Sequence, residues 1–171
     1  MNMPDKNTCI LSYSNSQEVL QAIRKLQANN FNLSTVSIIG NGNDKNECVV
    51  GIYRKAGQTR FYGAQAMFWE SLWQTFDGEL FLMVPESESL TAAGLIVSLL
   101  VKEQDDVDIH GFSVLGTALF RMGVPGESIH QYESAIKAEK ILLIVNAERT
   151  EVERSCEILQ SESQQATVHL A

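Results

Sequence analysis

The middle of the chain looks like a membrane segment that carboxylates interrupt, and this feature constrains the possible folds most strongly. Residues 67–100 are rich in bulky apolar side chains, but five acidic residues divide them into short runs. A helix that spans a bilayer needs roughly 18 or more consecutive apolar residues. The longest run without charged residues in this part of the chain, 89–101, has thirteen. The segment is therefore predicted to fold in water, packed on a sheet or on a partner chain, with no transmembrane segment. Peripheral contact with a membrane is the less favoured alternative.

Composition and charge indicate one globular domain. Hydrophobic residues make up 44% and charged residues 20% of the 171 residues, a balance that supports a core of useful size. Residues 61–110 hold nine Asp or Glu against one Lys, and such an acidic region would repel nucleic acid. Three cysteines are too few for a disulfide framework, and no secretory signal is evident. We expect a cytoplasmic protein with reduced thiols.

The chain begins with a pattern typical of a βαβ unit. Residues 8–14 are apolar and β-prone, and Asn15 and Glu18 have the spacing of a helix-capping pair. Residues 34–40 and 48–55 read as two further strands. The helix between the first two strands has an apolar stripe made of Val19, Ala22, Ile23 and Leu26.

The C-terminal end repeats this pattern. Residues 140–146 read as a central strand and 165–171 as a terminal one. Thr150 and Glu153 have capping-pair spacing at the start of the helix between them. The apolar stripe of that helix is Val152, Cys156 and Leu159. When the two units are aligned by their helices, Cys156 falls on the position of Ile23.

The middle of the chain reads as mainly helical. Residues 61–76 form an amphipathic pattern, and 78–85 fit either a strand or a continued helix. Residues 89–101 and 109–120 read as buried helices. A last helix follows a Pro-Gly turn in 123–138, with Ile129, Tyr132 and Ile136 on one side.

Together these elements predict a single α+β domain spanning residues 1–171. Residues 1–56 and 124–171 are the two βαβ halves of a ferredoxin-like split βαβ sandwich. Residues 57–123 are predicted to be a helical insertion between them.

Three stretches, taken in order, resemble a known family. They are "RKAGQTRFYGAQAMFWESLWQTF", "FLMVP" and "GFSVLGTALFRMGVPGESIHQYESAIKAEKILLIVNA". This order is similar to that of the YflT-like bacterial general stress proteins and of related proteins of unknown function with a glycine-rich apolar middle. The most specific part is Gly123, Val124, Pro125, Ser128, Tyr132, Glu133, Ala135, Ile136, Lys137 and Ala138.

The resemblance covers roughly the whole chain and implies a stress-associated protein. The resemblance assigns no catalytic residues, because no activity is established for the family. The chain departs from the family in its middle, where "WESLWQTFDGEL" and "VPESESLTAAG" replace glycine-rich apolar sequence. This departure argues against membrane insertion, as the length of the apolar runs does.

An acidic loop offers a candidate metal site. Asp105, Asp106, Asp108 and His110 lie close together in sequence, and carboxylate oxygens with an imidazole can hold a divalent cation. The loop lacks the glycine and the terminal glutamate of a calcium-binding loop. The simpler interpretation is a solvated connection in which Asp108 caps the following helix.

A basic turn offers a candidate anion site. Arg54, Lys55 and Arg60 precede a predicted helix start, where backbone N–H groups favour negative charge. No glycine-rich phosphate-binding spacing is present. The simpler interpretation is a solvated turn that pairs with the acidic middle.

An aromatic stripe offers a candidate interface. Phe68, Trp69, Trp73 and Phe76 fall within nine residues, a large apolar load for one short helix. Aromatic side chains concentrate at the centres of protein interfaces. A stripe at helical spacing is also what a core helix requires.

Catalysis by the histidines or cysteines finds little support in the sequence. His110, His130 and His169 are possible bases, and Cys9, Cys48 and Cys156 are possible nucleophiles. The cysteines occupy apolar positions, where cysteine usually packs as a small hydrophobe. No cofactor is expected. We predict a non-enzymatic protein that acts by homo-oligomerisation or partner binding, with a small-ligand or anion sensor as the alternative.

Overall fold

The computed structural model describes residues 7–41, 68, 71–72, 81–84, 90–96, 99, 111–160 and 166–170. In chain order, the elements are β1 (Thr8–Tyr13), α1 (Ser16–Ala28), the 3-10 helix η1 (Leu33–Thr35), β2 (Val36–Asn41), β3 (Phe81–Val84), β4 (Leu90–Gly94), α4 (Gly111–Arg121), α5 (Gly126–Lys137), β5 (Ile141–Asn146), α6 (Arg149–Leu159) and β6 (Thr167–His169). The mixture of helices with an antiparallel sheet confirms the α+β class.

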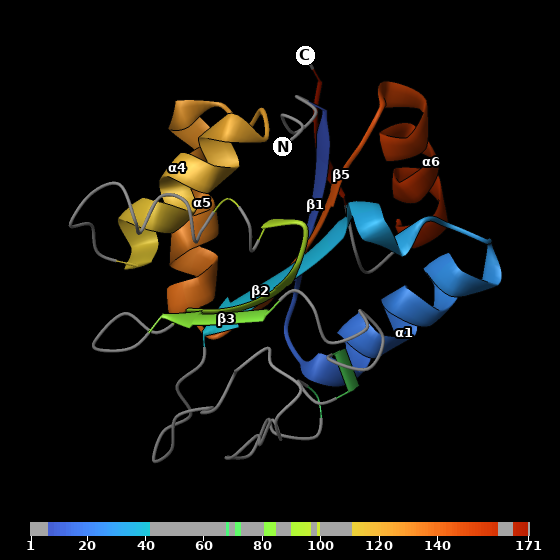
Figure 1. The fold of residues 1–171 in the computed structure, drawn as a ribbon, viewed down its shortest axis with the longest axis horizontal. Coiled ribbons are helices and arrows are strands. Elements are labelled where there is room, and N and C mark those ends of the chain that lie inside the picture. The colour runs from blue at the N-terminus through green and yellow to red at the C-terminus, as the bar shows by residue number, and fades with distance from the viewer. Residues whose placement is uncertain are drawn as a thin grey trace.

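The strands form one six-stranded sheet in the order β3-β4-β2-β5-β1-β6. The sheet lies between the helices (Figure 1). Each neighbouring pair is antiparallel. β5 lies between β1 and β2, and β1 lies between β5 and β6. Thr8 at the start of β1 therefore faces Asn146 on one side and His169 on the other. The two ends of the chain interleave in one sheet.

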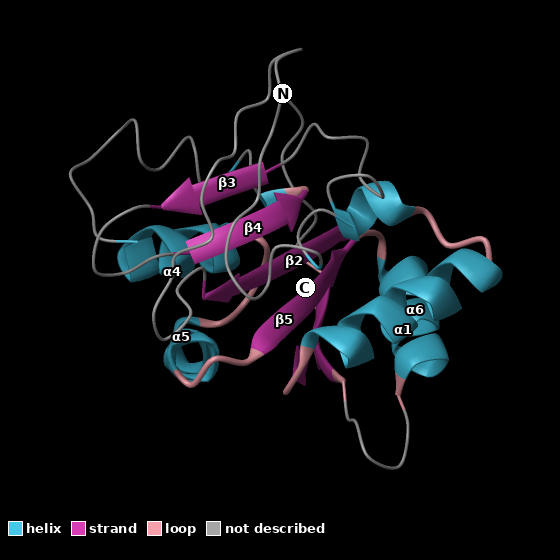
Figure 2. Cartoon of the chain, turned by 90° about the horizontal axis from the view of Figure 1, so that it is seen from below, coloured by secondary structure: helices cyan, strands magenta, loops and turns pink. Residues whose placement is uncertain are grey.

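Helices cover both faces of this sheet (Figure 2). α1 and α6 lie on one face, and α4 and α5 on the other; we call these the α1/α6 face and the α4/α5 face. All six residues of β5 are buried. Successive side chains of a strand point to opposite faces, so Leu143 packs with the α1/α6 core and Leu142 with the α4/α5 core. A continuous apolar strand is what burial on both faces requires.

The α1/α6 face follows the predicted βαβ pattern closely. The Asn15 side chain accepts a hydrogen bond from the backbone N–H of Glu18, at 3.0 Å, and caps α1 as its spacing predicts. The predicted stripe of α1 is buried against the sheet: Val19, Ala22, Ile23 and Leu26. On α6, Val152 and Leu159 are buried and Cys156 is partly buried.

The α4/α5 face depends on two close approaches. A Cβ at Gly116 would lie 3.2 Å from Ile129 Cγ2, so α4 and α5 pack tightly at this point. Gly94 has a φ of +100°, and a Cβ there would lie 2.2 Å from the Val36 carbonyl oxygen. Gly94 is thus required for the turn that ends β4 and directs the chain to Ile96, which is buried on this face.

Two sequence predictions are wrong. Residues 90–94 form strand β4, not part of a buried helix, so the middle of the chain adds strands to the sheet and is not wholly helical. A short apolar run cannot distinguish a buried strand from a buried helix. The first residue of α6 is Arg149 and its N-cap is Glu148, which places Thr150 inside the helix and not at its cap.

Other predictions are confirmed, and one concerns residues that the structure does not describe. Residues 81–84 resolve as a strand, and the helices predicted in 109–120 and 123–138 are α4 and α5. The strand predicted in 48–55 lies outside the described residues.

No helix in the described part of the chain is both long enough and apolar enough to cross a bilayer.

Candidate functional site

Polar side chains gather on the α4/α5 face at the end of the sheet where β1 begins. Thr8, Asn146 and His169 occupy one row across β5, β1 and β6. Residues directly opposite in antiparallel strands point to the same face. Tyr132, on α5, reaches the same place because its hydroxyl contacts His169. We call these four residues the polar row.

Asn146 joins three segments of the chain. Its side-chain amide donates to the Asn7 carbonyl at 3.2 Å, to Thr8 Oγ1 at 3.0 Å and to the Met122 carbonyl at 3.2 Å. The Thr8 hydroxyl also donates to the Met122 carbonyl, which directly follows α4. The side chains of Thr8 and Asn146 are buried. β5, β1 and the end of α4 are therefore held together by buried hydrogen bonds.

Tyr132 and His169 connect α5 to the edge strand β6. The Tyr132 hydroxyl and His169 Nε2 share a hydrogen bond of 2.7 Å. Their rings meet edge to face, with centroids 5.9 Å apart. Burial raises the pKa of Tyr132 and lowers the pKa of His169. Both shifts favour the neutral forms, so this contact is a hydrogen bond between uncharged groups at neutral pH.

The polar row is suited to holding the fold together more than to reaction chemistry. Its hydrogen bonds run between parts of the chain itself, and burial opposes the charged forms that a general base or acid must reach. The sequence contains no local signal for the row, because its members are spread from position 8 to position 169. The closest hint is Asn146, a polar residue that ends an otherwise apolar strand.

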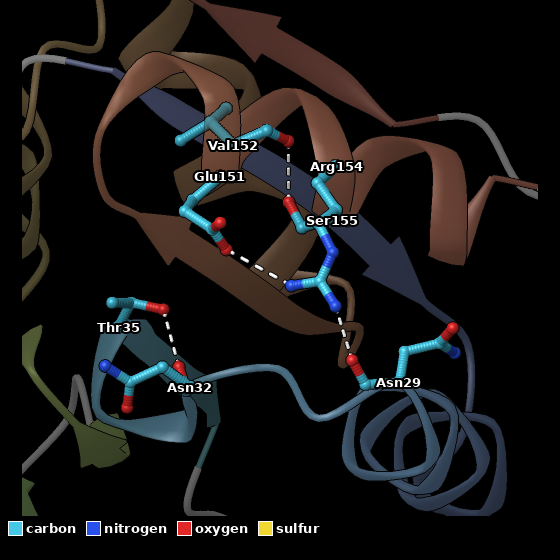
Figure 3. A network of polar contacts seen from close by, with 7 residues as sticks. All are labelled: Asn29, Asn32, Thr35, Glu151, Val152, Arg154 and Ser155. Atoms are coloured by element: carbon cyan, nitrogen blue, oxygen red, sulfur yellow. Dashed lines mark hydrogen bonds and ion pairs between the residues drawn. The ribbon is translucent and has the colours of Figure 1, made fainter.

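On the α1/α6 face, Arg154 of α6 makes polar contacts with its own helix and with the end of α1 (Figure 3). Its guanidinium donates to the Asn29 carbonyl after α1 and to Glu151, with an N–O distance of 3.3 Å. It also lies over the ring of buried Phe31, 5.4 Å from the centroid. Ser155 donates to the Val152 carbonyl at 2.7 Å. The contacts of Arg154 with Asn29 and Phe31 fix α6 against the segment that links α1 to β2.

The described cysteines and histidines are not arranged for nucleophilic catalysis. Burial raises the pKa of the Cys9 thiol to about 12, with a further contribution from nearby Cys156, so Cys9 is protonated at neutral pH. His130 is exposed on α5, and His169 is bound to Tyr132. No group of three or more His, Cys, Asp or Glu that could hold a metal ion occurs among the residues that the structure describes.

Most residues of the three predicted sites lie outside the described part of the chain. They are Arg54, Lys55 and Arg60 of the anion site, Asp105, Asp106, Asp108 and His110 of the metal site, and Trp69, Trp73 and Phe76 of the aromatic stripe. Phe68 is described: it is 5% exposed and packs, with Leu72, in the core of the α1/α6 face.

An antiparallel sheet with a helix pair on each face defines an α+β protein whose two chain ends share one sheet. Residues 8–91 match the model of the heat induced stress protein YflT domain. This match supports the resemblance of the segment to the YflT-like general stress proteins. The match begins with β1 and ends inside β4, so α4, α5 and the C-terminal βαβ half lie beyond it. No curated protein and no solved structure matches the chain.

Proposed function

We propose that this stress-family protein acts in the cytoplasm without catalysis, by associating with a second copy of itself. The observation that supports self-association most directly is a pair of exposed apolar side chains, Phe120 at 61% and Leu170 at 40% exposure. Phe120 lies in the last turn of α4, and Leu170 directly follows β6. Three scattered cysteines favour a reducing compartment.

Both side chains belong to the same end of the sheet. Met122, two residues after Phe120, accepts a hydrogen bond from Thr8. His169, the residue before Leu170, pairs with Thr8 across the strands. Exposed aromatic and aliphatic groups are typical of the centre of an interface. In a two-fold dimer the same surface of each chain faces its copy, so both residues would contribute from each chain.

We further propose that the two βαβ halves form a ferredoxin-like unit. The order β2-β5-β1-β6, with each βαβ unit split by a strand of the other, supports this assignment. β3 and β4 then extend the sheet beyond β2, and α4 and α5 cover the face that a two-layer sandwich leaves open. In this proposal the chain is one domain with the halves 1–56 and 124–171.

Light scattering after size exclusion tests self-association. We expect the average mass to rise above the 19.0 kDa of one chain as concentration increases. Phe120→Ser and Leu170→Ser are expected to weaken association at least tenfold. Gln17→Ser, an exposed change on α1, serves as the control and leaves it unchanged. A mass of one chain at every concentration would refute the proposal.

The aromatic stripe supplies a second arm of the same experiment. The core position of Phe68 leaves Trp69, Trp73 and Phe76 as the members proposed to contact another chain. If the double variant Trp69→Ser, Trp73→Ser dissociates the assembly while Phe120→Ser does not, the interface lies at the stripe and not at the end of the sheet.

A further inference from the structure

Two thiols from opposite ends of the chain lie on the α1/α6 face. Cys9 lies in β1 and is fully buried, while Cys156 lies in the last turn of α6 and is partly exposed. Both pack in the same core. α6 packs against β1, and the Cys156 thiol contributes to the raised pKa of Cys9. The two thiols therefore lie on the same side of the sheet, where α6 covers β1.

Fixed structure surrounds both thiols. Cys9 is paired with Val145 of β5 on one side and with Val168 of β6 on the other. The Cys156 thiol donates to the side-chain oxygen of Gln160 at 3.4 Å. Buried Val152 and Leu159, one turn before and one turn after, anchor α6 on the sheet. Both thiols are therefore held by packed secondary structure and not by mobile segments.

We propose that Cys9 and Cys156 form a reversible intramolecular disulfide when the protein meets a peroxide. The partly exposed Cys156 thiol is oxidised first: it becomes a sulfenic acid, and hydrogen peroxide is reduced to one water. The Cys9 thiol then attacks the Cys156 sulfur, the S–S bond forms, and the hydroxyl leaves with the Cys9 proton as a second water. In total, two thiols lose two hydrogen atoms and one peroxide yields two waters.

The different exposures of the two cysteines assign their roles. A peroxide in solution reaches Cys156, whereas Cys9 is shielded from it. Cys9 reacts only with the group that lies against it, because neighbouring reactants in a fixed geometry have a high effective concentration. Its burial raises its pKa and so slows the second step. The bond would join β1 to α6 and close most of the chain into one covalent loop, which restricts the unfolded state.

Peptide mass spectrometry tests this proposal. The Cys48→Ser protein removes the third thiol and is treated, while folded, with hydrogen peroxide. Free thiols are then blocked with N-ethylmaleimide before digestion without reductant. We expect one linked peptide pair containing Cys9 and Cys156, with a mass lower by two hydrogen atoms than the sum of the reduced peptides. Dithiothreitol is expected to separate it, and the oxidised protein is expected to melt at a higher temperature.

Single variants separate the two steps. In Cys9→Ala, the sulfenic acid of Cys156 has no resolving thiol, so dimedone labelling at Cys156 is expected to increase several-fold. In Cys156→Ser, Cys9 is expected to remain reduced at the same peroxide dose. The wild-type protein, digested in the same way, gives the answer even if a variant does not fold. Oxidation of Cys156 to sulfinic acid with Cys9 still reduced, or a disulfide between two chains, would overturn the proposal.

Discussion

The two faces of the sheet are both buried, but different parts of the chain build them. On the α1/α6 face, the helices come from the two βαβ halves, and their stripes were visible in the sequence as 3.6-residue patterns. On the α4/α5 face, helices from the middle and the second half pack on the sheet, with the polar row at one end. Local pattern is sufficient to predict the first face, whereas the second depends on contacts between residues far apart in sequence.

The largest effect is expected where the chain turns onto the α4/α5 face. In Gly94→Ala, the new Cβ meets the Val36 carbonyl oxygen in a backbone conformation with positive φ. We expect a loss of more than about 4 kcal/mol in the free energy of unfolding, and little folded protein by circular dichroism. The control is Gly126→Ala at the start of α5, where a Cβ meets nothing within 4 Å. A folded Gly94→Ala protein that melts with the wild type would show that this turn is wrongly placed.

The second effect concerns the polar row. Asn146→Ala removes the amide that donates to the carbonyls of Asn7 and Met122 and to Thr8 Oγ1. We expect a loss of about 1–3 kcal/mol in urea unfolding, because the variant loses the hydrogen bonds through which Asn146 joins three segments of the chain. Asn29→Ala, which removes an exposed hydrogen bond to the Lys25 carbonyl, should cost less than about 0.5 kcal/mol. Equal losses for the two variants would contradict the buried position of Asn146.

The third effect is a pH dependence from the α1/α6 face. The pKa of Cys9 is about 12 in the folded state against an ordinary value of 9.0. The folded state holds this proton more tightly, so its stabilising contribution is complete below pH 9 and is lost as the pH rises towards 12. We expect the free energy of unfolding to fall by about 1 kcal/mol per pH unit in this window, measured with reductant.

Cys9→Ala should remove this part of the slope. The pKa of Tyr13 is also raised by burial, from 10.0 to about 12, and its contribution remains in the variant. Parallel curves of stability against pH for wild type and variant would mean that Cys9 is not buried as described.

The smallest effect concerns the surface of α6. Arg154→Ala removes the hydrogen bond to the Asn29 carbonyl and the contact with the Phe31 ring, for an expected cost of about 1 kcal/mol. Arg149→Ala removes an ion pair with Glu153 in which both side chains are well exposed, so its cost should stay below about 0.5 kcal/mol. Thermal melts of the two variants that coincide would remove the special role given to Arg154.

The sequence predicts those elements best that carry their own signals. The cap at Asn15 and the continuous apolar run of β5 identify α1 and the central strand without tertiary information. The sequence wrongly predicts a helix at residues 90–94, because their apolar character fits a helix as well as a strand. Only the pairing of β4 with β2 shows that they form a strand. The sequence predicts the start of α6 too late, at Thr150. The actual N-cap, Glu148, makes no side-chain capping hydrogen bond by which it could be recognised.

The polar row and the paired thiols could not be read from the sequence for a different reason. Their members are single residues on separate elements, and only the interleaving of the two chain ends brings them together. The sequence identifies Tyr132 and Cys156 as members of apolar stripes on their helices. A stripe does not show which residues of other elements pack against it. The predicted anion, metal and aromatic sites remain predictions.

Burial of one sheet on both faces is the central claim, and two adjacent residues of β5 test it most directly. Leu142 and Leu143 are both 0% exposed and point to opposite faces. Leu142→Ala and Leu143→Ala are each expected to lower the free energy of unfolding, measured in urea, by about 2–5 kcal/mol. If either substitution costs less than about 1 kcal/mol, the face to which that side chain points is not a packed core, and the three-layer arrangement is wrong.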